Sequence, residues 1–162
     1  MKTAAVVTVS DGVSAGTRQD ESGEALASRL ESAGYEVTHR TVVADDAGAI
    51  ARTIRGYVDQ VNLLVTTGGT GFGPRDVTPE ATLQVVEKQA PGMMMLMLST
   101  GMESTPMAAL SRGVVGSAGR TLIVNLPGSP KGATENLEAL LVVIPHALDL
   151  LEGDTEHQTS AD

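Results

Sequence analysis

A glycine-rich segment, residues 66–71 (TTGGTG), directly follows an apolar run that predicts a buried strand. Small residues let backbone N–H groups approach a phosphate closely, so the segment favours a phosphate-binding loop. The P-loop pattern is excluded because no Gly-Lys-Ser/Thr follows. The dinucleotide-binding fingerprint is excluded because Pro74 stands where its third glycine belongs. A tight structural turn remains the alternative interpretation of these glycines.

Two charged residues, Arg75 and Asp76, stand just past this loop. A guanidinium binds phosphate oxygens in a forked geometry, and a carboxylate is a preferred ligand of Mg²⁺. The pair therefore favours a phosphate clamp beside a magnesium ligand. The alternative is a simple Arg–Asp pair on the surface.

A second anion site is predicted in residues 125–131 (NLPGSPK). Ser129 is a residue type that caps helices, and Pro130 fits the first helical position. The N-terminus of such a helix can receive an anion, with Lys131 beside it. The alternative is a well-capped helix with a solvated lysine.

Three shorter segments add polar groups near predicted strand ends or in loops. Ser10-Asp11 follows the first predicted strand, and Asp45-Asp46 follows the second. Either aspartate of the second pair can cap the following helix, and one cap suffices, so the other carboxylate is free for another role. Ser111-Arg112 supplies a cation in a glycine-flanked loop, with an ordinary surface loop as the alternative.

The elements that must position these groups alternate between strand and helix patterns. Short apolar runs at residues 4–9, 63–65 and 121–126 predict buried strands, and residues 35–43 alternate as a strand with one wetter face. Amphipathic helices are predicted between them, one with Thr78 as its cap, and a last helix starts at Ser129 and kinks at Pro145. This order predicts a three-layer α/β/α fold with a mainly parallel, Rossmann-like sheet, in which ligands bind outside the carboxyl ends of the strands.

Composition sets further limits on the function. The 162 residues carry 11 Lys or Arg, 20 Asp or Glu and three aromatics, so neither a nucleic-acid surface nor a stacked-base platform is expected. Cysteine is absent, which excludes disulfides and Cys-based zinc sites and favours a cytoplasmic protein. No apolar stretch is long enough to span a membrane. We expect one domain over residues 1–151 and a disordered acidic tail over 152–162.

Residues 66–82 (TTGGTGFGPRDVTPEAT) and 110–132 (LSRGVVGSAGRTLIVNLPGSPKG), with VSDGVSAG near the start, resemble the Mog/MoaB family of molybdenum-cofactor biosynthesis. The similarity extends over about residues 4–151. It implies a molybdopterin adenylyltransferase that uses Mg²⁺ with ATP and takes molybdopterin as its substrate. It also implies a homotrimer or hexamer, with a downstream molybdenum-insertion protein as a possible partner. Alternatives are a non-catalytic molybdopterin- or protein-binding member of the same fold and, less favoured, a competence-damage type nucleotide pyrophosphatase.

The resemblance also implies roles for individual residues. Asp45 and Asp76 match the two catalytic aspartates of the family, and we expect them to organise Mg²⁺. The expected substrate- and nucleotide-binding residues are Ser10, Asp11, Gly68, Gly69, Thr70, Gly71, Arg75, Ser111, Arg112, Asn125, Pro127, Gly128, Ser129 and Lys131. Among these, Arg75, Arg112 and Lys131 are predicted to neutralise phosphates. The methionine-rich run at 93–98 predicts an apolar helix face, buried in the core or used as a subunit contact.

Overall fold

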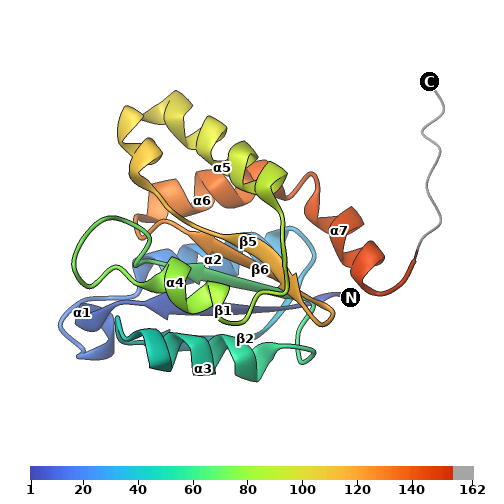
Figure 1. The fold of residues 1–162 in the computed structure, drawn as a ribbon, viewed down its shortest axis with the longest axis horizontal. Coiled ribbons are helices and arrows are strands. Elements are labelled where there is room, and N and C mark those ends of the chain that lie inside the picture. The colour runs from blue at the N-terminus through green and yellow to red at the C-terminus, as the bar shows by residue number, and fades with distance from the viewer. Residues whose placement is uncertain (155–162) are drawn as a thin grey trace.

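The computed structural model describes residues 1–154, which form a six-stranded sheet with helices on both faces (Figure 1). The strand order is β2-β1-β3-β6-β5-β4. The strands are β1 (Thr3–Val9), β2 (Glu36–Val43), β3 (Leu63–Thr67), β4 (Lys88–Gln89), β5 (Val115–Ala118) and β6 (Thr121–Leu126). The first three and β6 pair in parallel, whereas β5 pairs antiparallel with β6 and β4 antiparallel with β5. The predicted α/β fold with a mainly parallel sheet is confirmed.

Helices cover the two faces of the sheet unequally (Figure 1). The helices are α1 (Asp11–Ser14), α2 (Glu21–Ser32), α3 (Ala47–Tyr57), α4 (Thr78–Leu83), α5 (Pro91–Ser104), the 3₁₀ helix η1 (Pro106–Leu110), α6 (Pro130–Leu140) and α7 (Ile144–Leu151). Side chains of α2, α5, α6 and α7 form one buried cluster with one face of the sheet. Side chains of α3 and α4 form the other. The predicted three-layer arrangement follows from these two cores.

The parallel strands are buried on both faces, which is why they read as continuous apolar runs rather than as alternating patterns. In β1, Ala4 and Val6 join one core while Ala5 and Val7 join the other. The register aligns the strand ends, since Thr8 of β1 lies opposite Thr67 of β3. The carboxyl ends of β1, β2, β3 and β6 therefore lie along one edge of the sheet.

Two helix boundaries differ from the sequence prediction. Thr78 does not cap α4: Val77 occupies the cap position, and the Thr78 hydroxyl donates to the carbonyl of Gly68. The predicted single kinked helix from Ser129 is two helices, α6 and α7, with Pro145 in the first turn of α7. Proline lacks the N–H that would continue α6 and clashes with the preceding turn, so the helix breaks rather than bends.

The predicted tail, residues 152–162, falls mostly outside the described residues. Its first residue, Glu152, ends α7 and is hydrogen-bonded to Lys2 and to the Asn62 side chain. The ordered body therefore reaches past the predicted boundary at Leu151. In the described part of the chain, no helix is both long and apolar enough to cross a bilayer.

Candidate active site

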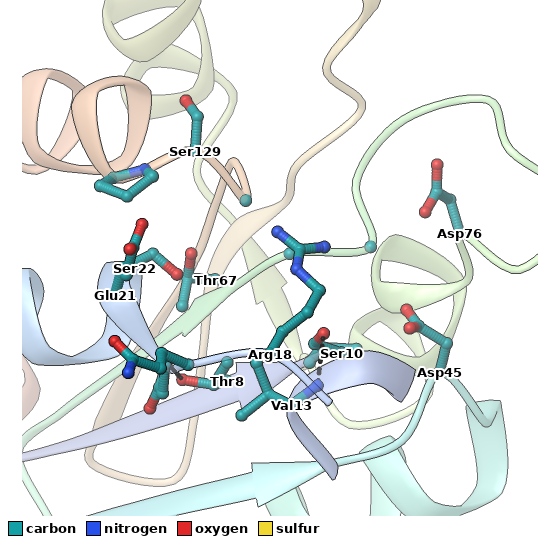
Figure 2. Close-up of a pocket in the computed structure, with 17 residues that line it drawn as sticks. Thr8, Ser10, Val13, Arg18, Glu21, Ser22, Asp45, Thr67, Asp76 and Ser129 are labelled. Carbon is teal, nitrogen blue, oxygen red and sulfur yellow. Dashed lines mark hydrogen bonds between the residues drawn. The ribbon is translucent and has the colours of Figure 1, made fainter. Parts of the chain in front are cut away.

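A cleft of about 480 Å³ opens at the carboxyl ends of β1 and β3 (Figure 2). The chain passes from β1 to β2 on one side and from β3 to β6 on the other, so the cleft lies at the topological switch point where α/β proteins bind ligands. We call it the polar cleft. Its lining residues are Thr8, Val9, Ser10, Val13, Arg18, Gln19, Asp20, Glu21, Ser22, Asp45, Thr67, Gly68, Gly69, Asp76, Gly128, Ser129 and Pro130.

Asp45 is held at the rim of the polar cleft by a reciprocal pair of hydrogen bonds with Asp11. The Asp11 N–H donates to Asp45 Oδ2 at 2.9 Å, and the Asp45 N–H donates to Asp11 Oδ1 at 3.0 Å. The neighbouring Asp46 caps α3 by accepting from the Ala49 N–H at 2.8 Å. The prediction that one of the two aspartates caps the helix is confirmed for Asp46, and Asp45, which does not cap α3, lines the polar cleft instead.

The Asp45 carboxyl is electrostatically strained. Burial raises its pKa above the usual value, and the nearby carboxylates of Asp11 and Asp76 raise it further. The hydrogen bond from the Asp11 N–H and the charge of Arg75 oppose this rise. A carboxylate in this state gains from a nearby cation, because a cation restores the stability that burial and like charge remove.

Asp76 faces the same cleft from the loop after β3 (Figure 2). Its Oδ2 accepts from the Gly73 N–H at 2.9 Å. In the part of the chain that the structure describes, no group of three or more His, Cys, Asp or Glu side chains is arranged to hold a metal ion. Mg²⁺ commonly uses one or two carboxylates together with substrate phosphates, so the pair Asp45 and Asp76 fits an ion that arrives with a nucleotide.

The glycines after β3 are required by close approach. Gly68 and Gly69 have φ of 102° and 69°, the left-handed region that favours glycine. A Cβ on Gly68 would lie 2.3 Å from the Val9 carbonyl oxygen, and one on Gly69 would lie 2.3 Å from the Thr78 hydroxyl. These glycines therefore bring the backbone of β3's loop against β1 and α4, where it forms the floor of the polar cleft.

The three cations predicted to bind phosphate do not line the polar cleft. Arg75 makes a forked ion pair with Asp11 at 2.9 and 3.0 Å, which lowers the pKa of that carboxyl. Arg112 donates to the carbonyls of Gly71 and Asp76 and pairs with Glu80. Lys131 is 81% exposed and lies 3.9 Å from Glu135. The two arginines hold other side chains and the loop in place.

A second hollow of about 290 Å³ adjoins the polar cleft, and Ser129 lines both. Its walls come mainly from α5, η1 and α6. We call it the apolar groove, because large apolar side chains such as Met97, Leu98 and Met107 line it. It is lined by Thr70, Gly71, Met97, Leu98, Gly101, Thr105, Met107, Ala108, Leu110, Ser111, Pro127, Ser129, Gly132, Glu135 and Asn136. The hydroxyl of Ser129 accepts from the Gly132 N–H at 3.0 Å, which confirms Ser129 as the cap of α6.

Asn125 departs from its predicted place in the ligand cleft. It is buried, with its side-chain oxygen accepting from the Val114 N–H and its amide N–H groups donating to the hydroxyls of Thr66 and Thr82. Both amide N–H groups and the side-chain oxygen are bonded inside the fold, so Asn125 links β6 to β3, to α4 and to the segment before β5. Among the other predicted site residues, the structure brings Ser10, Asp45, Gly68, Gly69, Asp76, Gly128 and Ser129 to the polar cleft, and Thr70, Gly71, Ser111 and Pro127 to the apolar groove.

The combination of glycine loop, paired aspartates and capped α6 at one switch point agrees with the comparison to known families. The MoCF_biosynth family model, described as "Probable molybdopterin binding domain", matches residues 5–146. The chain belongs to the MoCF_biosynth family. The resemblance to the Mog/MoaB proteins is thereby confirmed.

Individual members of the MoCF_biosynth family are similar over most of the chain. Molybdopterin adenylyltransferase of Helicobacter pylori (strain J99) is 41% identical over 155 residues, covering 92% of this chain and 87% of that protein. The molybdenum cofactor synthesis protein cinnamon of Drosophila melanogaster is 40% identical over 152 residues, but the chain spans only 25% of its length. The crystal structure of the molybdopterin biosynthesis enzyme MoaB from Thermus thermophilus superimposes with a TM-score of 0.89 at 48% identity, covering 94% of this chain and 98% of that one.

Several residues of this MoCF_biosynth cleft escaped the sequence analysis. The cleft is also lined by Arg18, Asp20 and Glu21. In the segment between β1 and β2, no site residue beyond Asp11 was predicted from the sequence, and these three come seven or more residues after Asp11. Asp20 caps α2 by accepting from the Gly23 N–H at 3.0 Å, and its other oxygen lies 3.3 Å from Arg40. The sequence did hold a signal for them: Asp20 and Glu21 are acidic residues at the start of an amphipathic helix, a pattern that marks a helix N-terminus. That N-terminus lies where the chain returns to the edge of the sheet.

Proposed function

We propose that this protein is a molybdopterin adenylyltransferase of molybdenum cofactor biosynthesis. It binds molybdopterin and ATP, transfers AMP to the molybdopterin phosphate and releases pyrophosphate. One observation carries the proposal: Asp45 and Asp76 face one polar cleft at the switch point of the sheet. The names of the related adenylyltransferases, which match over most of the chain, support it.

The reaction makes modest demands on acid–base chemistry. An oxygen of the molybdopterin phosphate, already anionic at neutral pH, attacks the α-phosphorus of ATP. The bond between the α-phosphorus and its bridging oxygen to the β-phosphorus breaks, and both electrons leave with pyrophosphate. No general base is needed, so the protein has to align two phosphates and to stabilise the charge that develops on the leaving group.

The residues of the polar cleft divide this work between them. The backbone N–H of Gly69 and the N-terminus of α6 after Ser129 can donate to phosphate oxygens, whereas the Gly68 N–H already donates to the Leu126 carbonyl at 3.1 Å. Asp45 and Asp76 are the side chains that would hold Mg²⁺, which would neutralise phosphate charge when bound with the nucleotide. Arg75 acts indirectly, as a positioning residue: it pairs with Asp11, and Asp11 in turn hydrogen-bonds Asp45. The apolar groove beside Ser129 provides room for the less charged part of a substrate.

The decisive experiment incubates the protein with molybdopterin and MgATP and measures both pyrophosphate and the adenylylated product. Formation of the two in equal amounts supports the proposal. Binding of molybdopterin without either product would contradict it and favour a non-catalytic member of the family. An Asp45→Asn, Asp76→Asn double variant serves as the inactive control.

The assembly belongs to the same proposal, and we expect a homotrimer. Large apolar side chains are exposed along α5 and η1, namely Met95, Leu96, Met102, Met107 and Leu110. Methionine packs against varied shapes, so this surface suits a subunit contact. Light scattering at micromolar concentration is expected to give three times the chain mass. A hexamer would keep the contact and add another, whereas a monomer would contradict the proposal.

A further inference from the structure

The polar cleft is short of positive charge for a site that takes phosphates. Among the described residues that line it, four carry carboxyl groups and one carries a guanidinium. The acids are Asp20, Glu21, Asp45 and Asp76, and within residues 1–154 only Asp20 has an ion-pair partner, Arg40 at 3.3 Å. The guanidinium belongs to Arg18.

None of the three predicted phosphate cations lines the polar cleft. Arg75 is forked onto Asp11, and Arg112 is bonded to Glu80 and to two loop carbonyls. Moving either arginine onto a substrate would cost the contacts that shape the loop and hold Asp45. Lys131 lines neither hollow and is mostly in solvent. A phosphate in the polar cleft therefore meets Arg18 first.

Arg18 is positioned for this contact. Figure 2 shows its side chain extending into the space that the labelled residues surround. Within residues 1–154 its guanidinium has neither a hydrogen-bond acceptor nor an ion-pair partner. Its five N–H donors are thus available to a ligand, and a planar fork of donors matches two oxygens of one phosphate.

A backbone hydrogen bond and the absence of a side chain at Gly12 place the stem of Arg18 against α1. The Arg18 N–H donates to the Gly12 carbonyl at 3.2 Å, closing the loop after α1. The stem lies on Gly12 itself: a Cβ at position 12 would come within 2.8 Å of Arg18 Cδ. Gly12 therefore makes the space that lets the arginine lie across α1 and reach into the cleft.

We propose that Arg18 binds a phosphate group of the substrate in the polar cleft, the role that the sequence pattern assigned to Arg75, Arg112 and Lys131. This inference rests on the proposed adenylyl transfer. The phosphate has two possible sources, the triphosphate of ATP and the terminal phosphate of molybdopterin. In either case the guanidinium offsets negative charge that the acidic lining of the cleft would otherwise repel.

The test compares Arg18→Gln and Arg18→Lys with Arg55→Gln, a matched control. Arg55 lies in the last turn of α3, is exposed and lines neither hollow, so its variant changes net charge equally. Arg18→Gln is expected to lower kcat/KM by about 10- to 100-fold, as loss of a charged hydrogen bond does. A rise confined to the KM for ATP identifies the triphosphate, and one confined to the KM for molybdopterin identifies its phosphate. Arg18→Lys is expected to recover part of the loss because it keeps the charge but not the fork.

A binding measurement separates this inference from the proposed function. Titration calorimetry with inorganic pyrophosphate and Mg²⁺ needs no turnover, and Arg18→Gln is expected to weaken that binding by about 10-fold or more. If the native protein shows no adenylyl transfer but this difference persists, the proposed function fails and the phosphate contact stands. If Arg18→Gln matches Arg55→Gln in pyrophosphate affinity and in both KM values, the inference is overturned.

A second variant tests the geometry without removing the charge. Gly12→Ala places a methyl group where the Arg18 stem lies, and it is expected to raise the same KM that Arg18→Gln raises, by a smaller factor. In an Arg18→Gln background, Gly12→Ala is expected to have little further effect. Equal effects in both backgrounds would show that Gly12 acts independently of Arg18, and would contradict the packing argument.

Discussion

The two ends of the sheet carry similar chemistry and differ in how it is used. At the end opposite the polar cleft, a hollow of about 510 Å³ is lined by Asp59, Arg120, Glu152 and four other residues. Glu152 is bonded to Lys2 and Asn62, and Asp59 accepts from the Arg120 N–H at 2.7 Å. This hollow is as large and as polar as the cleft, so neither size nor composition separates the two.

The two ends of the sheet differ in whether their carboxyl groups already have a basic partner. The hydrogen bond from Lys2 lowers the pKa of Glu152, which marks a charge whose partner is already in place. Burial raises the pKa of Asp45, which has no ion-pair partner within residues 1–154 because Arg75 is paired with Asp11. Within residues 1–154, Asp45 and Asp76 accept backbone hydrogen bonds but have no ion-pair partner, and a carboxylate without such a partner has more to gain from a bound cation.

The largest expected difference between the two ends concerns Asp76. Asp76→Asn is expected to lower adenylyl transfer by about 100-fold or more, since the amide keeps the shape but loses the charge that draws a cation. Asp149→Asn is the control at the opposite end, where an exposed pair with Lys2 contributes about 0–1 kcal/mol. Product formation and thermal melting of both variants check this. Normal turnover of Asp76→Asn with an unchanged melting curve would contradict the assignment.

An intermediate effect is expected at Arg75, which positions Asp45 through Asp11. Arg75→Gln is expected to reduce kcat by about 10-fold and to raise the Mg²⁺ concentration needed for half-maximal rate. Arg75→Lys is expected to restore part of both. A change in the KM for ATP alone, with the Mg²⁺ dependence unmoved, would instead indicate that Arg75 binds the nucleotide directly.

A smaller effect concerns pH and stability, with opposite signs at the two ends. The raised pKa of Asp45 means that the folded state holds its proton more tightly, so ionisation removes stability as pH rises through that pKa. The lowered pKa of Glu152 means that its ionisation adds stability above pH 4.5, which is lost as pH falls through the folded pKa.

Asp45→Asn is therefore expected to raise the Tm at pH 7 by about 1–3 °C, and Glu152→Gln to lower it by a similar amount. Each difference is expected to shrink as the pH falls through the folded-state pKa of the carboxyl concerned, which is raised for Asp45 and lowered for Glu152. Melting curves recorded from about pH 3 to pH 8 check the signs. A lower Tm for Asp45→Asn at neutral pH would contradict the comparison.

The smallest effect is expected from removing residues 155–162. The contacts that join the C-terminal end to the body already involve Glu152, so truncation after Asp154 is expected to leave the Tm within about 1 °C and the activity unchanged. Truncation after Leu151, which removes Glu152, is the matched comparison and is expected to lower the Tm further. A fall of several degrees from the shorter deletion would show that the tail binds the body.

Much of the fold could be predicted from local patterns, and the misses have a common cause. Hydrophobic patterns in the sequence were long enough to identify the apolar strands β1, β3 and β6 and the amphipathic helices α2 and α3. The short strands β4 and β5 have two and four residues, and neither has a hydrophobic pattern of its own. They form strands because β5 pairs with β6 and β4 pairs with β5 in the folded protein. These are long-range contacts that a local sequence pattern does not show.

The positions of the site's carboxylates and glycines could be predicted from the order of strands and loops along the chain. Asp45, Asp76 and the loop at Gly68 each follow a strand end, and parallel strands bring their ends to one edge. The partners of the long cations were decided only by the tertiary structure: Arg75 reaches Asp11, 64 residues away in the chain, and Arg112 reaches Glu80. A short side chain stays where its backbone places it, whereas an arginine can pair with any acceptor within its reach, and those acceptors are known only once the chain has folded.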